Sequence, residues 1–174
     1  DDGLAHISQD GGKSWENITP KDWPEWMMVN SVEPSRHEPG TCYIAGTRYK
    51  LGDYTPYLYK TSDYGKTWQR ITKGIESEHF TRVLREDLTQ RGLLYAGTEA
   101  GMYVSFDDGD QWQKFQLNLP EVPITDLTLK NNDLIVATQG RSLWMIDDLS
   151  VLHQLREAKG NENFLFKPKD TYRM

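Results

Sequence analysis

Short apolar runs separated by polar turns recur along the chain, at the length expected of β-strands rather than helices. Three of these runs end in a small residue followed by Thr, and each is predicted to be a buried strand: Tyr43–Thr47, Leu94–Thr98 and Leu134–Thr138. Another strand-like stretch precedes each run, at Val29–Glu33, Phe80–Arg85 and Ile124–Leu129. The pattern predicts pairs of strands that repeat along an all-β chain.

A second repeat has the pattern Ser/Thr-x-Asp-x-Gly-x-x-Trp, which we call the box. Its Trp residues stand at positions 15, 68 and 112, which are 53 and 44 residues apart. The three copies consist of Ser8, Asp10, Gly12 and Trp15; of Thr61, Asp63, Gly65 and Trp68; and of Ser105, Asp107, Gly109 and Trp112. A short strand-like stretch follows each Trp, at Trp15–Thr19, Trp68–Thr72 and Trp112–Gln116. Each box therefore stands between two predicted strands.

The residue types of the box favour one rigid hairpin turn. The Asp side chain can accept hydrogen bonds from backbone N–H groups two residues on, and the Ser or Thr hydroxyl can tie the preceding strand to the turn. The Gly can take a positive φ without a Cβ penalty. The Trp is expected to pack between sheets, where its indole N–H needs one partner.

Four strands, A to D in chain order with the box between C and D, make a unit that is typical of a propeller blade. We predict an all-β partial β-propeller of about three and a half four-stranded antiparallel blades. The expected divisions are a partial blade of strands C and D at 1–20, full blades at 21–73 and 74–119, a terminal degenerate blade with a short exit helix at 120–158, and a linker and tail at 159–174.

The last repeat departs from the box. Thr98 precedes Asp107 by nine residues, and the same count from Thr138 places the box aspartate at Asp147. The Gly position then holds Leu, for which a positive φ is costly, so the same hairpin is not expected. Apolar residues at 149, 152 and 155 favour a short helix over 148–156 instead. Residues 159–163 are a polar linker, and 164–166 are predicted to start another element or a strand that pairs back onto the body.

Such a piece of propeller leaves two sheet edges open, because closed rings need roughly four to eight blades. We therefore expect a fragment completed by the remaining blades of a parent protein or by a second copy of the chain.

The boxes resemble the bacterial neuraminidase (BNR, Asp-box) repeat, and residues 1–155 resemble the propeller of the sortilin-type and BNR-repeat family. Residues 137–149 are similar to the closing blade of large secreted bacterial BNR-repeat proteins, in which a segment like 166–173 follows the propeller. The resemblance implies Asp-box C–D hairpins with a structural role, and a secreted or cell-envelope location in a bacterium. Such boxes occur in sialidases, xyloglucanase-type hydrolases, sorting receptors and photosystem assembly factors, so the resemblance indicates a fold more than a function.

Composition excludes several classes of partner. A net charge of −6 and a pI near 5.2 argue against nucleic-acid binding, and weakly against an anionic membrane surface. No stretch approaches about 18 consecutive apolar residues, so membrane insertion is not expected. The single cysteine, Cys42, is expected to be a buried small hydrophobe. Six Trp and nine Tyr supply large rings to fill the core.

Metal and cofactor sites are not predicted. The four histidines, at positions 6, 37, 79 and 153, lack the spacing of metal ligands. The boxes lack the alternating carboxylates and the Glu at position twelve of an EF-hand loop. No Gly-x-Ser-x-Gly nucleophile motif occurs.

The B–C and D–A loops of a blade lie on one face, which we call the loop face, and loops on a rigid scaffold commonly carry function. The candidate ligand-contacting residues on this face are Trp23, Arg48, Tyr49, Asp53, Tyr54, Glu99 and Arg141. Their aromatic rings could stack on a sugar or grip a peptide. Trp26, in the same loop as Trp23, is expected to pack between blades.

We expect a scaffold or binding module for a carbohydrate or a protein, with one alternative from another class. A glycoside hydrolase needs two carboxyl groups about 5–10 Å apart across the scissile bond. The eligible residues by position are Asp22, Asp53, Glu25, Glu76 and Glu99, and the pattern singles out none of them. The alternative is therefore part of a hydrolase whose active site needs blades outside this chain.

Overall fold

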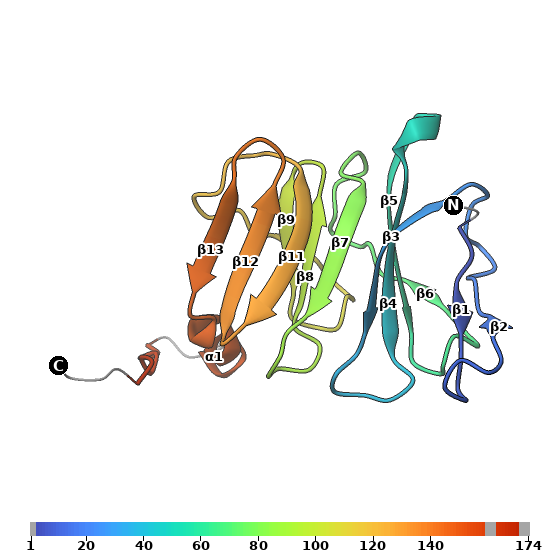
Figure 1. Cartoon of the computed structure of the whole chain (residues 1–174). Helices are drawn as coiled ribbons and strands as arrows, with labels where there is room; N and C mark the ends of the chain where they lie inside the picture. The colour runs from blue at the N-terminus through green and yellow to red at the C-terminus, as the bar shows by residue number, and fades with distance from the viewer. Residues whose placement is uncertain (1–2, 159–162, 171–174) are drawn as a thin grey trace.

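The computed structural model describes residues 3–158 and 163–170 and shows an all-β partial propeller. Four antiparallel sheets stand side by side, and within each the strands pair in chain order (Figure 1). The first sheet holds β1 (His6–Ile7) and β2 (Glu16–Asn17). The second holds β3 (Met28–Pro34), β4 (Cys42–Arg48), β5 (Asp53–Thr61) and β6 (Gln69–Arg70), with the 3-10 helix η1 (Tyr49–Leu51) between β4 and β5.

The third and fourth sheets repeat this plan. The third holds β7 (Thr81–Glu86), β8 (Leu94–Thr98), β9 (Gly101–Ser105) and β10 (Gln113–Lys114). The fourth holds β11 (Ile124–Lys130), β12 (Asp133–Thr138) and β13 (Leu143–Asp147), and is followed by the helix α1 (Ser150–Ala158). The A, B and C strands predicted from the apolar pattern are present, and the D strands β2, β6 and β10 shrink to two residues each.

Aromatic rings fill the space between the sheets, as the composition suggests. The largest fully buried side chains include Trp112, Tyr43, Tyr59, Tyr95 and Tyr103. Tyr43 and Trp112 belong to one core cluster between the second and third sheets, and Tyr95 belongs to another between the third and fourth. Buried tyrosine hydroxyls find acidic partners at the sheet ends, as Tyr43 does with Asp108 at 2.6 Å.

The box forms the C–D hairpin through a carboxylate that gathers donors. Asp63 accepts hydrogen bonds from the hydroxyl of Thr61 and the backbone N–H of Thr67, both at 2.9 Å. Equivalent contacts surround Asp10 and Asp107. The backbone donor is four residues after the aspartate rather than the expected two. The reason is that two successive left-handed residues, at 64 and 65 in the second sheet, curl the chain around the carboxylate.

Two of the three box tryptophans form a hydrogen bond with the preceding sheet. The indole N–H of Trp112 donates to the carbonyl of Ile71 at 2.7 Å, and that of Trp68 donates to the carbonyl of Ile18 at 2.6 Å. Trp15 does not fit the expectation of burial, because it is 65% exposed. In the described chain no sheet precedes the first one, so this ring has no preceding sheet to pack against.

The fourth sheet corrects the placement of its box aspartate. The carbonyl of Asn132 accepts the N–H of Leu149, as Gly92 accepts that of Asp108, so Asp148 stands at the box position and not Asp147. The B–C loop is one residue longer here, since Ala137 pairs with Leu143 whereas Gly97 pairs with Met102. Counting from Thr138 therefore gives a position that is one residue too early.

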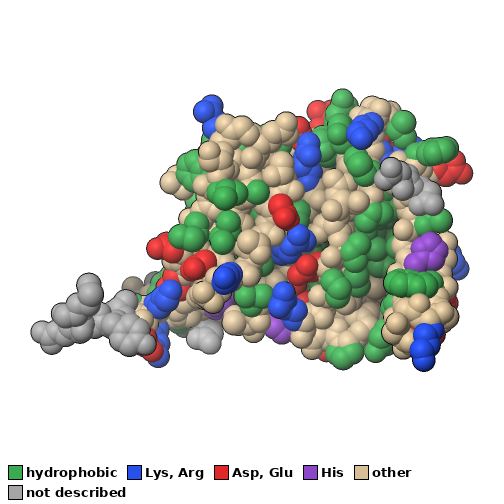
Figure 2. All heavy atoms as spheres, in the orientation of Figure 1, with side chains coloured by type: hydrophobic (Ala, Val, Ile, Leu, Met, Phe, Trp, Pro, Cys, Tyr) green, Lys and Arg blue, Asp and Glu red, His purple; other side chains and the backbone are tan. Residues whose placement is uncertain are grey.

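The space-filling view shows apolar side chains over this sheet (Figure 2).

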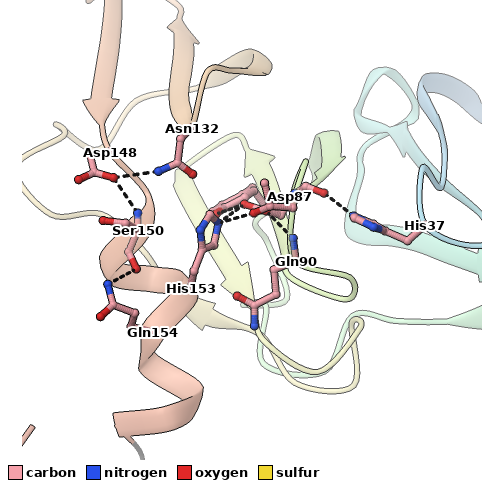
Figure 3. A network of polar contacts seen from close by, with 10 residues as sticks. His37, Asp87, Gln90, Asn132, Asp148, Ser150, His153 and Gln154 are labelled. Atoms are coloured by element: carbon pink, nitrogen blue, oxygen red, sulfur yellow. Dashed lines mark hydrogen bonds and ion pairs between the residues drawn. The ribbon is translucent and has the colours of Figure 1, made fainter. Parts of the chain in front are cut away.

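Helix α1 replaces the box hairpin, two residues later than predicted, and a polar network anchors it (Figure 3). The carboxylate of Asp87, at the A–B turn of the third sheet, lies 2.9 Å from Nε2 of His153 on the helix. Burial raises the pKa of Asp87, but hydrogen bonds from His153 and from the backbone of Thr89 and Gln90 outweigh burial, and the pKa is lowered. A hydrogen bond between His153 and Asp87, rather than a Trp, thus joins the helix to the third sheet.

Residues 163–170 contain no strand, contrary to one of the expectations, and Lys167 exchanges two backbone hydrogen bonds with the Gln154 side chain. Cys42 is half-buried rather than buried as expected, and burial raises the pKa of its thiol to about 11, so the thiol is protonated at neutral pH. No helix within the described residues is long and apolar enough to cross a membrane.

Candidate functional site

The loop face lies at the top of Figure 1, where η1 projects beyond the ends of the strands. Arg48 ends β4 and Asp53 begins β5, so these two residues pair across the base of the η1 loop. Gly52 closes the helical turn with a left-handed φ of 75°. The loop is therefore an extension of the β4–β5 hairpin rather than a loose insertion.

A carboxylate clamp holds the base of this loop. Nη1 of Arg48 lies 3.0 Å from Oδ2 of Asp53, and the Tyr57 hydroxyl donates to the same oxygen at 2.8 Å. The backbone N–H of Thr55 donates to Oδ1 at 3.1 Å. Burial raises the pKa of Asp53, but these hydrogen bonds outweigh burial and the pKa is lowered. Asp53 is a fixed anion.

Above the clamp is a group of rings and charges that we call the aromatic–arginine cluster: Tyr49, Tyr54, Phe80, Arg82 and Glu99. The Tyr49 ring stacks on Phe80 with centroids 5.1 Å apart and planes 7° apart. Tyr54, which is 50% exposed, lies 6.0 Å from the same ring. The buried Phe80 therefore supports two tyrosines that face solvent.

Arg82 ties the cluster to the third sheet. Its guanidinium lies 5.2 Å from the centroid of Phe80 and 5.8 Å from that of Tyr49. Its Nη2 lies 2.6 Å from the Glu99 carboxylate, which also accepts from Nε at 2.8 Å. An arginine that is stacked and forked onto a carboxylate is fixed in position. The cluster thus presents a preordered surface built from two sheets.

Of the seven predicted contact residues, three belong to the cluster (Tyr49, Tyr54 and Glu99), two form the clamp at the base of the same loop (Arg48 and Asp53), and two lie elsewhere (Trp23 and Arg141). Trp23 is half-buried and packs against Tyr59 at 5.0 Å, over a Gly46 whose Cβ would lie 2.7 Å from the indole. Arg141 is exposed on the fourth sheet, where its carbonyl accepts the indole N–H of Trp144. Both therefore lie outside the cluster.

Trp26 contradicts the expectation that it packs between blades, because it is 72% exposed. The chain turns at this residue with a φ of 61°, and Met27 takes the inter-sheet position with no exposed surface. Trp23, Pro24 and Trp26 border a shallow pocket of about 320 Å³ at the end of the first sheet.

Sequence reasoning missed Phe80 and Arg82, the centre of the cluster. Both fall in a stretch that the apolar pattern assigns to a buried strand. The predicted pairing of strands A and B could have revealed them, because the start of strand A lies beside the end of strand B. Thr81, between Phe80 and Arg82, pairs with Thr98, and the loop residue Glu99 follows directly.

The two carboxylates of this site are both paired with arginine, Asp53 with Arg48 and Glu99 with Arg82. The lowered pKa of Asp53 does not suit the acid of a glycosidase, which needs a raised pKa. Within the described residues no three His, Cys, Asp or Glu side chains are grouped to hold a metal ion.

Comparison with known proteins supports the fold. No protein-family model and no curated protein matches the chain. Among solved structures, YCF48 bound to a D1 peptide aligns with a TM-score of 0.61 at 20% identity, over 84% of this chain and 46% of that one. YCF48 from Cyanidioschyzon merolae gives 0.58 at 16% identity, over 85% and 47%. A GH74 enzyme from Niastella koreensis gives 0.54 at 14% identity, over 69% and 21%.

These likenesses identify a β-propeller fold and no more, because all the identities are below 25%. This chain spans about half the length of the two YCF48 structures.

Proposed function

We propose that this chain is a protein-binding scaffold segment of a larger β-propeller, and that its partner contacts the aromatic–arginine cluster on the loop face. The observation that carries the proposal is the rigid support of exposed Tyr54 and half-exposed Tyr49 by Phe80 and Arg82. Tyrosine and arginine are the residue types that dominate binding hot spots. Ordering them in advance lowers the entropy cost of association.

A protein partner suits this surface better than a small glycan. The η1 loop projects from the body in Figure 1, and Leu51 at its end is 57% exposed. A projecting apolar loop fits a groove on a partner, whereas small ligands are usually held in concave sites. One of the similar structures, YCF48, is described as bound to a D1 peptide, so this fold can receive a polypeptide.

The alternative function is a share in a glycoside hydrolase site, favoured by the likeness to GH74 enzymes. On this chain the pairing of Asp53 and Glu99 with arginine argues against a hydrolase site.

We also propose that further blades of a parent protein cover the exposed faces of the first and fourth sheets. The parent is secreted or in a bacterial cell envelope, as the resemblance of the boxes implies.

Selection of binders from a displayed random-peptide library tests the proposal. We expect selected peptides to lose about tenfold or more in affinity on Tyr54→Ala, because truncating a hot-spot tyrosine costs over 1 kcal/mol. Tyr64→Ala is the matched control, since Tyr64 is 44% exposed in a box hairpin on the opposite face. Binders that tolerate Tyr54→Ala would contradict the proposal. Polysaccharide hydrolysis that disappears in Asp53→Asn would support the hydrolase instead.

A further inference from the structure

The arginines of the loop-face site are already paired with carboxylates. Arg82 in the cluster meets the Glu99 carboxylate, and Arg48 in the clamp below meets that of Asp53. The two arginine side chains are only 19% and 25% exposed. Neither guanidinium is therefore left as an unneutralised cation for an acidic group of a partner.

The site lies between sheets that are both flanked within the described chain. The second and third sheets each have another sheet on either side (Figure 1). Hydrogen bonds join the first sheet to the second through Trp68 and Ile18, and the third to the fourth through Arg85 and Asp126. Further blades of a parent protein would stand beyond the first and fourth sheets and would not flank this site.

Carboxylates lie beside the exposed rings of the cluster. Glu76 and Glu78 are exposed in the loop that leads into Phe80, and the Glu76 side chain is 62% exposed. The backbone N–H of Glu99 donates to the Phe80 carbonyl at 3.1 Å, and the Glu99 carboxylate holds Arg82. Both contacts from Arg82 reach Oε2 of Glu99, and no other described residue bonds to its Oε1.

Few cations oppose these carboxylates. Arg82 and Glu99 neutralise each other, which leaves Glu76 and Glu78 against the exposed Lys50 of η1. Among the described residues neither Lys50 nor Glu78 has an ion pair. The charge around the rings is therefore net negative, and the whole chain has a net charge of −6. A field of this sign attracts positively charged segments of a partner.

The chain already holds guanidinium groups against its own rings. Arg82 lies 5.2 Å from the centroid of Phe80, and Arg70 lies 4.9 Å from that of Tyr57. Tyr54 is 50% exposed, tilts by 40° from Phe80, and has no cation over its ring among the described residues. Its open face can take one more cation, because the π face of an aromatic ring is electronegative.

We propose that the partner of the loop face presents an arginine or lysine side chain to the aromatic–arginine cluster. The cation packs on the open face of Tyr54, and Oε1 of Glu99 and the Glu78 carboxylate accept its N–H groups. This inference rests on the proposed function, because it names the chemistry of the polypeptide that the same site receives.

Segments of other kinds fit this surface less well. An acidic segment would meet the carboxylates of Glu76 and Glu78, with Lys50 as its exposed counter-charge in this part of the described chain. An apolar segment would cover the rings but would bring no donors to the carboxylates beside them, and burying a carboxylate without donors is unfavourable.

A labelled peptide Gly-Ser-Arg-Ser-Arg-Ser-Gly tests the inference on the full chain by fluorescence polarisation at low salt and pH 8, where histidines carry no charge. Its control carries citrulline in place of both arginines, which keeps the shape and removes the charge. We expect saturable binding of the arginine peptide, about tenfold tighter than that of the citrulline peptide, and weaker binding as salt is added.

Three variants of the chain locate the binding. Glu78→Gln should weaken it about two- to fivefold, the range of one exposed charge pair, and Lys50→Glu should strengthen it by a similar factor. Glu121→Gln is the matched control, because Glu121 is also an exposed carboxylate of a loop that leads into a strand A but is paired with Lys114 at 3.2 Å. It changes the net charge equally and should leave the affinity unchanged.

The outcomes separate this inference from the proposed function. Equal binding of the arginine and citrulline peptides, or no binding of either, would overturn the inference. An equal loss in Glu78→Gln and Glu121→Gln would overturn it too, because the attraction would then come from the overall charge. Library-selected peptides that depend on Tyr54 but lack arginine and lysine would refute the inference and leave the proposed function standing. Selected peptides that tolerate Tyr54→Ala would instead contradict the proposed function itself.

Discussion

At the scale of single residues, the box aspartates act as anions that gather donors. Hydrogen bonds from the hydroxyl and then the backbone of Thr67 lower the pKa of Asp63 to about 2, and Ser14 does the same for Asp10. A carboxylate whose folded pKa is depressed stabilises the fold above its unfolded pKa, and this contribution is lost as the pH falls through the folded pKa.

The melting temperature should therefore fall between pH 4 and pH 2, the interval between the ordinary Asp value of 3.8 and the folded value of about 2. Asp63→Asn removes one titrating group, so its melting temperature should fall less steeply over this interval. Calorimetry or circular dichroism at a series of pH values measures both slopes. Parallel slopes for variant and wild type would contradict the role given to this carboxylate.

The box tryptophans allow a matched comparison. Trp112→Phe removes the indole N–H and leaves the Ile71 carbonyl buried without its donor, which should cost about 1–3 kcal/mol of unfolding free energy. Trp15→Phe changes an exposed ring and should stay within about 0.5 kcal/mol. Urea unfolding of the two variants gives both values, and equal losses would show that the inter-sheet bond contributes little.

At the scale of elements, the strands were predictable because the box marks the turn between strands C and D, and the apolar runs that end in Thr mark strand B. The departures have local causes. One extra loop residue moved the box aspartate from Asp147 to Asp148. The centre of the cluster, Phe80 and Arg82, was hidden because a strand pattern reports burial and not which end of the strand meets a loop.

A hydrogen bond from His153 to Asp87 joins helix α1 to the third sheet, beside the packing of Leu149 and Leu152. His153→Ala would leave the Asp87 carboxylate buried without its main donor, so we expect a loss of about 1–3 kcal/mol and faster amide exchange in α1. Gln154→Ala alters the next residue, whose side chain bonds the tail and the Ser150 carbonyl of the helix itself but not the third sheet, and should change the exchange of α1 less. Unchanged exchange in His153→Ala would show that Leu149 and Leu152 hold the helix alone.

At the scale of the whole molecule, the repeat gathers every B–C and D–A loop on one face. Tyr49 and Glu99 are fifty residues apart in the chain and meet through Arg82 only because adjacent blades share this face. The box hairpins lie on the opposite face, where the hydrogen bonds that the three copies share serve the scaffold. The proposed binding face and the box hairpins are therefore on separate faces of the molecule.

Hydrogen–deuterium exchange of the chain with a library-selected peptide tests this separation most directly. We predict new protection at residues 49–54 and 80–82, with none in the box hairpin at 62–67. Protection confined to the box hairpins, with the loop face unchanged, would contradict the account.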